Sequence, residues 1–309
     1  MNSVRIFFTE ECNAKCPNCL NKTFRRDKLY IDKAKYILLC DYLSRNNIKG
    51  VKIMGGEPSL HPDFEELLSV SQHYFQRVSV FTNGIADAIE KFKPRKEDGI
   101  SYNFRFNKEL TKSKLLLSHL GYRSLEVLVE RNSNIEELSN QIQSVNALAP
   151  DRMTVMLTLD CTNAIFKERE EVLPKFESLF TKLQQDGVNV RIDHSLPICY
   201  VYGTKIPIYA KGSLCDTDCA GLIDSDFNLR YCNQHSEILV NLFSDERIIP
   251  FRIFENHLNS VFYRNQAYVL EKLCKNCLFF NNMCNGGCFV ASKLNKKEDI
   301  ISNTNLPVT

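Results

Sequence analysis

Three cysteines lie within eight residues near the N-terminus, in the pattern Cys12-x3-Cys16-x2-Cys19, directly after the apolar run 4–8. The apolar run predicts a short strand. Spacings of four and three residues cannot place all three thiols on one face of a strand, so we expect a loop that folds around a metal centre. A structural zinc site and an iron–sulfur cubane both normally take four protein ligands. Three thiols with no fourth nearby therefore indicate a centre with one open position.

Composition narrows the class of protein and of partner. The chain has 309 residues, 44% of them hydrophobic and 25% charged, and a formal net charge of +2, which gives no argument for a nucleic-acid or anionic-membrane partner. We find neither an apolar run of membrane-spanning length nor a signal-peptide pattern, so we predict a cytoplasmic protein. The cytoplasm disfavours disulfides, so thirteen cysteines there indicate metal binding.

The first two-thirds of the chain alternates strand-like and helix-like segments. Predicted strands cover residues 4–8, 51–54, 78–81, 100–106, 125–129 and 153–157, and an apolar alternation follows at 188–192. Repeated β–α units predict a parallel sheet with right-handed crossovers. Six units are fewer than the eight of a closed barrel. We therefore predict an open, partial (β/α)6 TIM-like barrel.

The helix-like segments carry recognisable faces and ends. Cys40 falls on the apolar face of a helix near residues 36–43, so we interpret it as a core residue. Asn134 with Glu137 resembles a capping box that opens the helix after the fifth strand. Gly187 is the expected C-cap of a helix over about 168–186.

Several chemically distinctive residues follow or end these strands. The cysteine loop follows the first strand, Gly55-Gly56-Glu57-Pro58 the second, Asn83 the third and Arg131 the fifth. Active sites of barrel folds gather at the carboxyl ends of the strands. We therefore expect these residues in one site.

Beyond residue 197 the pattern becomes irregular and rich in cysteine. This part holds Cys199, Cys215, Cys219, Cys232, Cys274, Cys277, Cys284 and Cys288. We predict a core domain over 1–197 and a cysteine-rich iron–sulfur domain over 198–309 that ends in a loose polar tail. Structural zinc is the alternative for this part alone, because Cys-x2-Cys and Cys-x3-Cys pairs also suit zinc ribbons.

The cysteine triad after a first strand, with Gly55-Gly56-Glu57-Pro58 after the second, resembles the radical SAM superfamily. The later cysteines resemble its SPASM-type extension, which carries auxiliary clusters. The resemblance implies that Cys12, Cys16 and Cys19 hold three irons of a 4Fe–4S cluster. It also implies that the fourth iron binds the amino and carboxylate groups of S-adenosylmethionine (SAM), whose reductive cleavage yields a 5′-deoxyadenosyl radical.

The resemblance also implies contacts to SAM. Gly55 and Gly56 would let the backbone approach the SAM amino group, and Glu57 before Pro58 would offer an acceptor there. A plain turn is the alternative for this motif. Expected contacts elsewhere are Arg131 to the carboxylate, Asn83 and Asn103 to ribose or carboxylate, and Leu157 to adenine, with surface, turn and core roles as their alternatives. The family usually has an aromatic residue where this chain has Asn18, which could form a hydrogen bond near adenine instead.

Eight cysteines remain for auxiliary clusters after the triad, Cys40 and Cys161 are set aside. By the family pattern, Cys215, Cys219, Cys232 and Cys288 would bind one cluster and Cys274, Cys277 and Cys284 a second. No cysteine follows Cys288, so the second cluster takes Cys199 or has a non-cysteine or open fourth site. Cys161 follows the sixth strand and is either a hydrogen-atom donor to a product radical or a buried structural thiol.

We therefore expect an enzyme that oxidatively modifies a peptide or protein side chain, by cross-linking or dehydrogenation, as a peptide natural-product maturase does. Only three residues precede the first strand, which leaves open a separate leader-peptide-binding protein, direct peptide binding or a small-molecule substrate. The resemblance implies an electron donor such as flavodoxin or ferredoxin. The alternatives are a radical dehydrogenase or epimerase of a small metabolite and, from another class, a non-catalytic metal-binding adaptor.

Overall fold

The computed structural model describes residues 3–16, 19, 21, 29–104, 122–147, 153–159, 169–192, 198–201, 203–206, 221–230, 237–244, 247–257 and 259. The chain divides into two compact units. The first comprises Met1–Leu125, Asp151–Met153 and Asp218–Asn259, and the second comprises Glu126–Pro150, Thr154–Thr217 and Ser260–Thr309.

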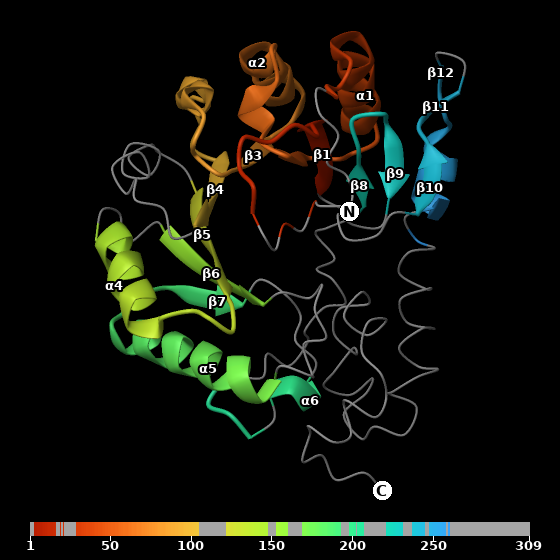
Figure 1. The fold of residues 1–309 in the computed structure, drawn as a ribbon. Coiled ribbons are helices and arrows are strands. Elements are labelled where there is room, and N and C mark those ends of the chain that lie inside the picture. The colour runs from red at the N-terminus through yellow and green to blue at the C-terminus, as the bar shows by residue number, and fades with distance from the viewer. Residues whose placement is uncertain are drawn as a thin grey trace, which may run out of the picture. The chain divides into compact units, whose positions relative to one another are not determined.

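The first unit is built on a sheet in the order β10-β9-β8-β1-β2-β3-β4 (Figure 1). Its strands are β1 (Ser3–Thr9), β2 (Gly50–Gly55), β3 (Arg77–Thr82), β4 (Gly99–Phe104), β8 (Leu222–Ile223), β9 (Asn228–Arg230) and β10 (Ile238–Asn241). The five strands from β8 to β4 are parallel, whereas β9 and β10 are antiparallel additions. A small hairpin of β11 (Phe243–Ser244) and β12 (Arg247–Ile248) follows.

Strand β1 is the central strand of this unit and is buried on both faces. It pairs with β2 on one side and β8 on the other. Phe8 packs edge-on against Tyr36 and Phe64, with ring centroids 5.2 and 6.4 Å apart. The neighbouring Phe7 points to the opposite face and packs with Leu222 and Met54. Burial on both faces explains why Ile6, Phe7 and Phe8 are consecutive apolar residues in this strand.

Helices α1 (Lys33–Arg45) and α2 (Phe64–Tyr74) lie on the same side of this sheet (Figure 1). The Asp32 side chain caps α1 by accepting from Lys35 N at 2.8 Å. Cys40 is fully buried on the apolar face of α1, which confirms its interpretation as a core residue. Two short 3₁₀ helices, η2 (Pro58–Leu60) and η3 (Asp87–Lys91), complete the helical side.

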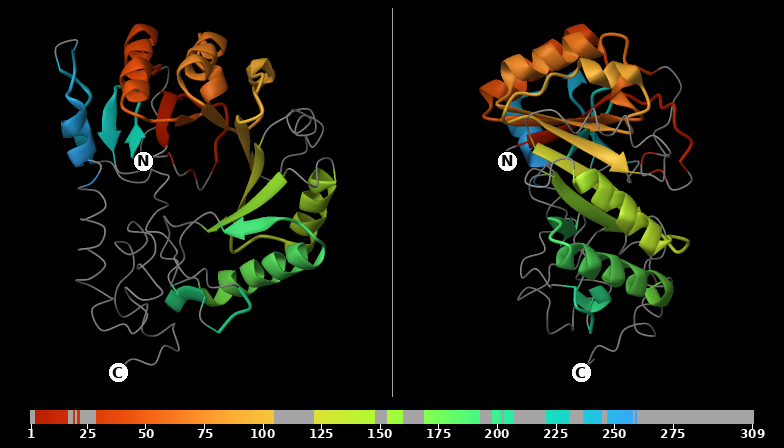
Figure 2. Two further views of the ribbon diagram at one scale, coloured as in Figure 1. Left: turned by 180° about the vertical axis from the view of Figure 1, so that it is seen from behind. Right: turned by 90° about the vertical axis from the view of Figure 1, so that its left-hand side faces the viewer.

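The second unit continues the β–α alternation. Strand β5 (Tyr122–Val129) runs into it from the first unit and is followed by α4 (Ile135–Asn146), β6 (Met153–Leu159), α5 (Arg169–Gln185), β7 (Val190–Ile192) and α6 (Ile198–Val201). Strands β6 and β7 are parallel. Helices α4 and α5 lie side by side (Figure 2), and Gln143 donates to Asp186 just after α5. Asn134 caps α4, and Gly187 follows α5 with φ +74°, so both predicted helix ends are confirmed.

The alternation of strands and helices that the sequence predicts is confirmed, with differences at its ends. Strand β4 ends at Phe104 in the described part, and residues 105 and 106 lie outside it. In the region predicted to be irregular, β8 pairs with β1 in the first unit. A strand of two residues is too short to show periodicity. The domain boundary at residue 197 stays a prediction.

No helix in the described ranges has the length and apolarity that a membrane crossing requires.

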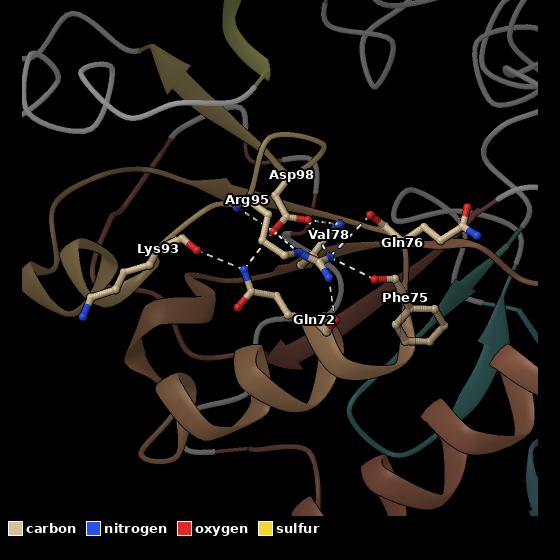
Figure 3. A network of polar contacts seen from close by, with 7 residues as sticks. All are labelled: Gln72, Phe75, Gln76, Val78, Lys93, Arg95 and Asp98. Carbon is tan, nitrogen blue, oxygen red and sulfur yellow. Dashed lines mark hydrogen bonds and ion pairs between the residues drawn. The ribbon is translucent and has the colours of Figure 1, made fainter.

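An ion pair between the half-exposed Arg95 and the buried Asp98 fixes the connection into β4 (Figure 3). The fully buried carboxylate of Asp98 accepts from Val78 N, Gln72 Nε2 and Arg95 Nε at 2.8–2.9 Å. The Arg95 guanidinium also donates to the carbonyls of Gln72 and Phe75, at 2.6 and 2.9 Å. Burial alone would raise the pKa of Asp98, but these donors lower it below its usual value.

Asp98→Asn should destabilise the fold by about 3 kcal/mol, because an amide NH2 would face donors that now meet a carboxylate. A carboxyl whose pKa is lowered by folding stabilises above its unfolded pKa of about 4, and this part is lost as the pH falls further. The free energy of unfolding, measured with urea at a series of pH values, should therefore fall less steeply in acid for the variant than for the wild type.

The matched control is Asp41→Asn. Asp41 forms an exposed i,i+4 ion pair with Arg45 on α1 at 3.0 Å. Its loss should cost at most about 0.5 kcal/mol. Equal losses in the two variants would show that the Asp98 network does not fix this connection.

Candidate active site

The candidate site lies where β1, β2 and β3 end. The three strands are neighbours and parallel, so their carboxyl ends share one edge of the sheet. The cysteine loop leaves β1 there, Gly55-Gly56-Glu57-Pro58 leaves β2, and Thr82-Asn83-Gly84 leaves β3. The predicted gathering of these three segments therefore follows from strand order.

The returning end of the cysteine loop is tied back to β1. Tyr30 forms an antiparallel bridge with Thr9. Ile31 N donates to Phe8 O at 2.9 Å, and the hydroxyl of Thr9 donates to Leu29 O at 2.8 Å. The Tyr30 hydroxyl donates to the Glu11 carboxylate, which raises the pKa of the tyrosine. The two ends of the loop are thus held together at its base.

Gly55 and Gly56 are required because the backbone before Cys12 passes directly against them. Gly56 N donates to Thr9 O at 2.9 Å. A Cβ on Gly55 would lie 2.1 Å from Thr9 O, and one on Gly56 would lie 2.1 Å from Glu11 O. Gly55 also has φ +150°, which L side chains rarely adopt. The sequence predicted glycines for an approach to a ligand, and the structure shows an approach to the cysteine loop.

The carboxylate of Glu57 joins the ends of β2 and β3. One of its oxygens accepts from Ser59 N, the Ser59 hydroxyl and the Thr82 hydroxyl at 3.2, 2.5 and 2.9 Å. The other accepts from Asn83 N at 2.7 Å. Glu57 N also donates to Glu11 O at 2.8 Å. Burial raises the pKa of the carboxyl, and the four hydrogen bonds to it oppose that rise.

Asn83 contacts the first cysteine of the triad. Its side-chain nitrogen donates to Asn13 Oδ1 at 2.9 Å and to Cys12 Sγ at 3.7 Å. Ala14 N also donates to Cys12 Sγ, at 3.4 Å. Sequence reasoning expected a ribose or carboxylate contact from Asn83 and missed this one. The only available signal was the position of Asn83 at the end of the neighbouring strand.

The three cysteines of the triad are half-buried reduced thiols. Within the described ranges, no group of three or more His, Cys, Asp or Glu side chains is placed to hold a single metal ion. Burial raises the pKa of the Cys40 thiol to about 12. It is therefore a neutral core thiol at neutral pH.

Asn21, which the sequence analysis did not single out, also lies at this site. Its side-chain nitrogen donates to Gly55 O at 2.5 Å. This contact fixes the orientation of the amide, because the reverse would set two acceptors against each other. The amide oxygen is buried and has no hydrogen-bond partner among the described residues. The site thus contains an acceptor suited to an N–H or O–H donor.

Three further predicted SAM contacts are among the described residues. Asn103 is exposed on β4. Arg131 belongs to the second unit, is exposed, and forms an ion pair with Glu171 of α5. Leu157 is fully buried in β6. The proposed roles of these three residues stay predictions.

Other predicted site residues fall outside the described residues. These are Asn18, Cys161, Cys215, Cys219, Cys232, Cys274, Cys277, Cys284 and Cys288. Cys199 belongs to the short helix α6.

Comparison with known proteins shows a likeness in the N-terminal part. Residues 6–105, which include the triad and the ends of β2 and β3, match the profile described as the radical SAM superfamily. This match covers about a third of the chain. A 77-residue segment is 34% identical to the mycofactocin maturase MftC of Mycobacterium ulcerans, and covers 25% of this chain and 21% of that protein. An 85-residue segment is 32% identical to the GTP 3′,8-cyclase of Psychromonas ingrahamii, and covers 26% of this chain and 25% of that protein. The matched segments thus span about a quarter or less of these relatives.

Solved structures extend the likeness in fold over almost the whole chain. The structure of anSMEcpe with bound AdoMet has a TM-score of 0.66 at 16% identity, and covers 98% of this chain and 95% of that one. The structure of Streptococcus suis SuiB bound to the precursor peptide SuiA has a TM-score of 0.60 at 14% identity. The likeness covers 98% of this chain and 76% of that one. These likenesses show the fold and confirm the predicted α/β partial-barrel class.

Gly56→Ala should destabilise the protein by roughly 3 kcal/mol, because the new methyl group meets fixed backbone of the cysteine loop. Gly187→Ala is the matched control, since a Cβ there would meet nothing within 4 Å. This control should lower the free energy of unfolding by only about 1 kcal/mol, because alanine would have to adopt the positive φ of Gly187. Hydrogen exchange at the amides of residues 56 and 57 should accelerate in the first variant alone. Unchanged exchange there would contradict the proposed close approach.

Proposed function

We propose that this protein is a radical SAM enzyme that cleaves SAM and oxidatively modifies a peptide or protein side chain. The observation that carries the proposal is the position of Cys12, Cys16 and Cys19 after β1 in a domain that matches the radical SAM profile. The sheet edge holds the start of this loop against Gly56 and Glu57 through two backbone hydrogen bonds.

The donor set fits an iron–sulfur cluster. Cys12, Cys16 and Cys19 would each bind a different iron, so they need not converge on one point as ligands of a single ion do. Two N–H groups directed at Cys12 Sγ suit a thiolate, which accepts hydrogen bonds more strongly than a neutral thiol does. When bound, the cluster supplies one electron for cleaving the sulfonium of SAM to a 5′-deoxyadenosyl radical.

The residues at the end of β2 would orient the methionine part of SAM. Asn21 Oδ1 beside Gly55, which has no hydrogen-bond partner among the described residues, offers an acceptor for an ammonium group. Glu57 is already occupied by four donors, so we assign it a positioning role rather than a direct contact. Its buried carboxylate would hold Thr82 and Asn83 in place and limit the access of water to this edge.

A peptide substrate is supported by the likeness to proteins whose names state such a role. MftC is a maturase, and SuiB was solved with a precursor peptide. We propose the same substrate class here, with flavodoxin or ferredoxin as the electron donor and a separate leader-peptide-binding protein as a further partner. We propose a cytoplasmic location, where a reducing environment would preserve the clusters.

We also propose auxiliary 4Fe–4S clusters in the cysteine-rich part, as a SPASM-type extension would hold. They would accept the second electron from the substrate radical or connect the site to the electron donor. Cys199 on α6 is our candidate for the ligand that the second cluster otherwise lacks.

A small-molecule substrate is the second candidate, favoured by the match to a GTP 3′,8-cyclase. Neighbouring reading frames separate the two. A short precursor peptide encoded nearby would favour peptide modification, whereas cofactor or sugar enzymes would favour a small metabolite. Transfer of deuterium from a labelled candidate substrate into 5′-deoxyadenosine would then identify the molecule attacked.

Changing Cys12, Cys16 and Cys19 together to Ala should abolish reductive SAM cleavage, because no open iron site would remain. Auxiliary iron should persist, measured as iron and sulfide after anaerobic reconstitution. Cys40→Ala is the control: it should lower stability by about 1 kcal/mol and leave cleavage unchanged. A colourless protein with zinc alone would refute the enzyme proposal, and undiminished cleavage in the triple variant would refute the role of the triad.

A further inference from the structure

The side chain of Asn83 is held in one orientation by contacts on both of its polar atoms. Its Oδ1 accepts from Ile85 N at 2.9 Å, so its Nδ2 must face the other way. There Nδ2 donates to Asn13 Oδ1 and Cys12 Sγ. The amide therefore presents an N–H, and not an oxygen, to the first cysteine of the triad.

The backbone at Asn83 is fixed as firmly as its side chain. Asn83 N donates to the buried carboxylate of Glu57 at 2.7 Å. The hydroxyl of the preceding Thr82 donates to the same carboxylate, and it accepts from the N–H of the following Gly84, both at 2.9 Å. The donor is thus anchored to β3, whereas the sulfur that it contacts belongs to the loop after β1.

We infer that Asn83 is a positioning residue that tunes the reduction potential of the cluster bound at Cys12, through its N–H···S hydrogen bond. The inference rests on the proposed function, since it requires the triad to bind a cluster. It replaces the expected ribose or carboxylate contact of Asn83 with a contact to the sulfur.

The direction of the effect follows from charge. Adding one electron to the cluster increases the negative charge on its thiolate ligands. A hydrogen-bond donor to such a sulfur stabilises the reduced state more than the oxidised state, and hydrogen bonds to the sulfurs are a recognised determinant of cluster potentials. Removing the donor should therefore make the cluster harder to reduce.

Asn83→Ala tests this inference in the reconstituted full-length protein. At a fixed potential, we expect a reduced-to-oxidised ratio roughly three to ten times lower than in the wild type. Tenfold corresponds to a midpoint about 59 mV more negative for one electron. The titration is followed on the EPR signal that changes when SAM is added, which separates this cluster from any auxiliary one.

Two further variants separate the hydrogen bond from loop positioning. Asn83→Asp keeps an acceptor for Ile85 N, loses the donor and adds a negative charge, so its potential should fall at least as far as that of Asn83→Ala. Asn13→Ala removes the other acceptor of Nδ2 and keeps the contact to Cys12, so its midpoint should stay close to that of the wild type.

The outcomes are distinguishable. A wild-type protein that assembles no SAM-responsive cluster overturns both the proposed function and this inference. A loaded protein whose midpoint is unchanged in Asn83→Ala and Asn83→Asp overturns the inference alone. An equal fall in Asn13→Ala also overturns it, because the effect would then come from the position of the loop.

Discussion

The buried carboxylate of Glu57 is the interaction on which the site depends. It is fully removed from water, which is costly for a charge, and burial raises its pKa. Four donors from Ser59, Thr82 and Asn83 offset that cost. These donors come from the segment after β2 and from the end of β3. Losing the carboxylate would therefore leave several polar groups buried without their present partner. The carboxylate thus makes the geometry of one strand end dependent on the other.

The same segment also positions the start of the cysteine loop, through its backbone. Thr9 O and Glu11 O accept from Gly56 N and Glu57 N, and the absence of side chains at Gly55 and Gly56 permits this contact. Contacts through backbone atoms leave the side chains of the loop available for ligands. Glu57 is therefore linked to β1 by its amide and to β3 by its carboxylate. Supporting contacts of this kind hold the residues of a site within tight geometric limits.

The sequence predicted what depends on local pattern. Periodicity located the strands and the helices, including the core position of Cys40, and the parallel arrangement predicted that the cysteine loop, Gly55–Glu57 and Asn83 would share an edge. It could not predict which atoms meet there. Asn83 and Cys12 are 71 positions apart, and their contact depends on the register of three strands. Likewise, β8 is specified by its pairing with β1 rather than by its two residues.

These contacts place Cys12 differently from the other two cysteines of the triad. Cys12 comes one residue after Glu11, whose carbonyl is bonded to Glu57 N, and its sulfur accepts from Asn83. Its position is thus set by the sheet, whereas Cys16 and Cys19 lie further along the loop. A cluster that must pass one electron to a neighbouring cofactor needs a fixed geometry and a controlled potential. Under the proposed function, the end of β1 would provide both at Cys12, because the residues that fix the position of Cys12 also hold the donor that faces its sulfur.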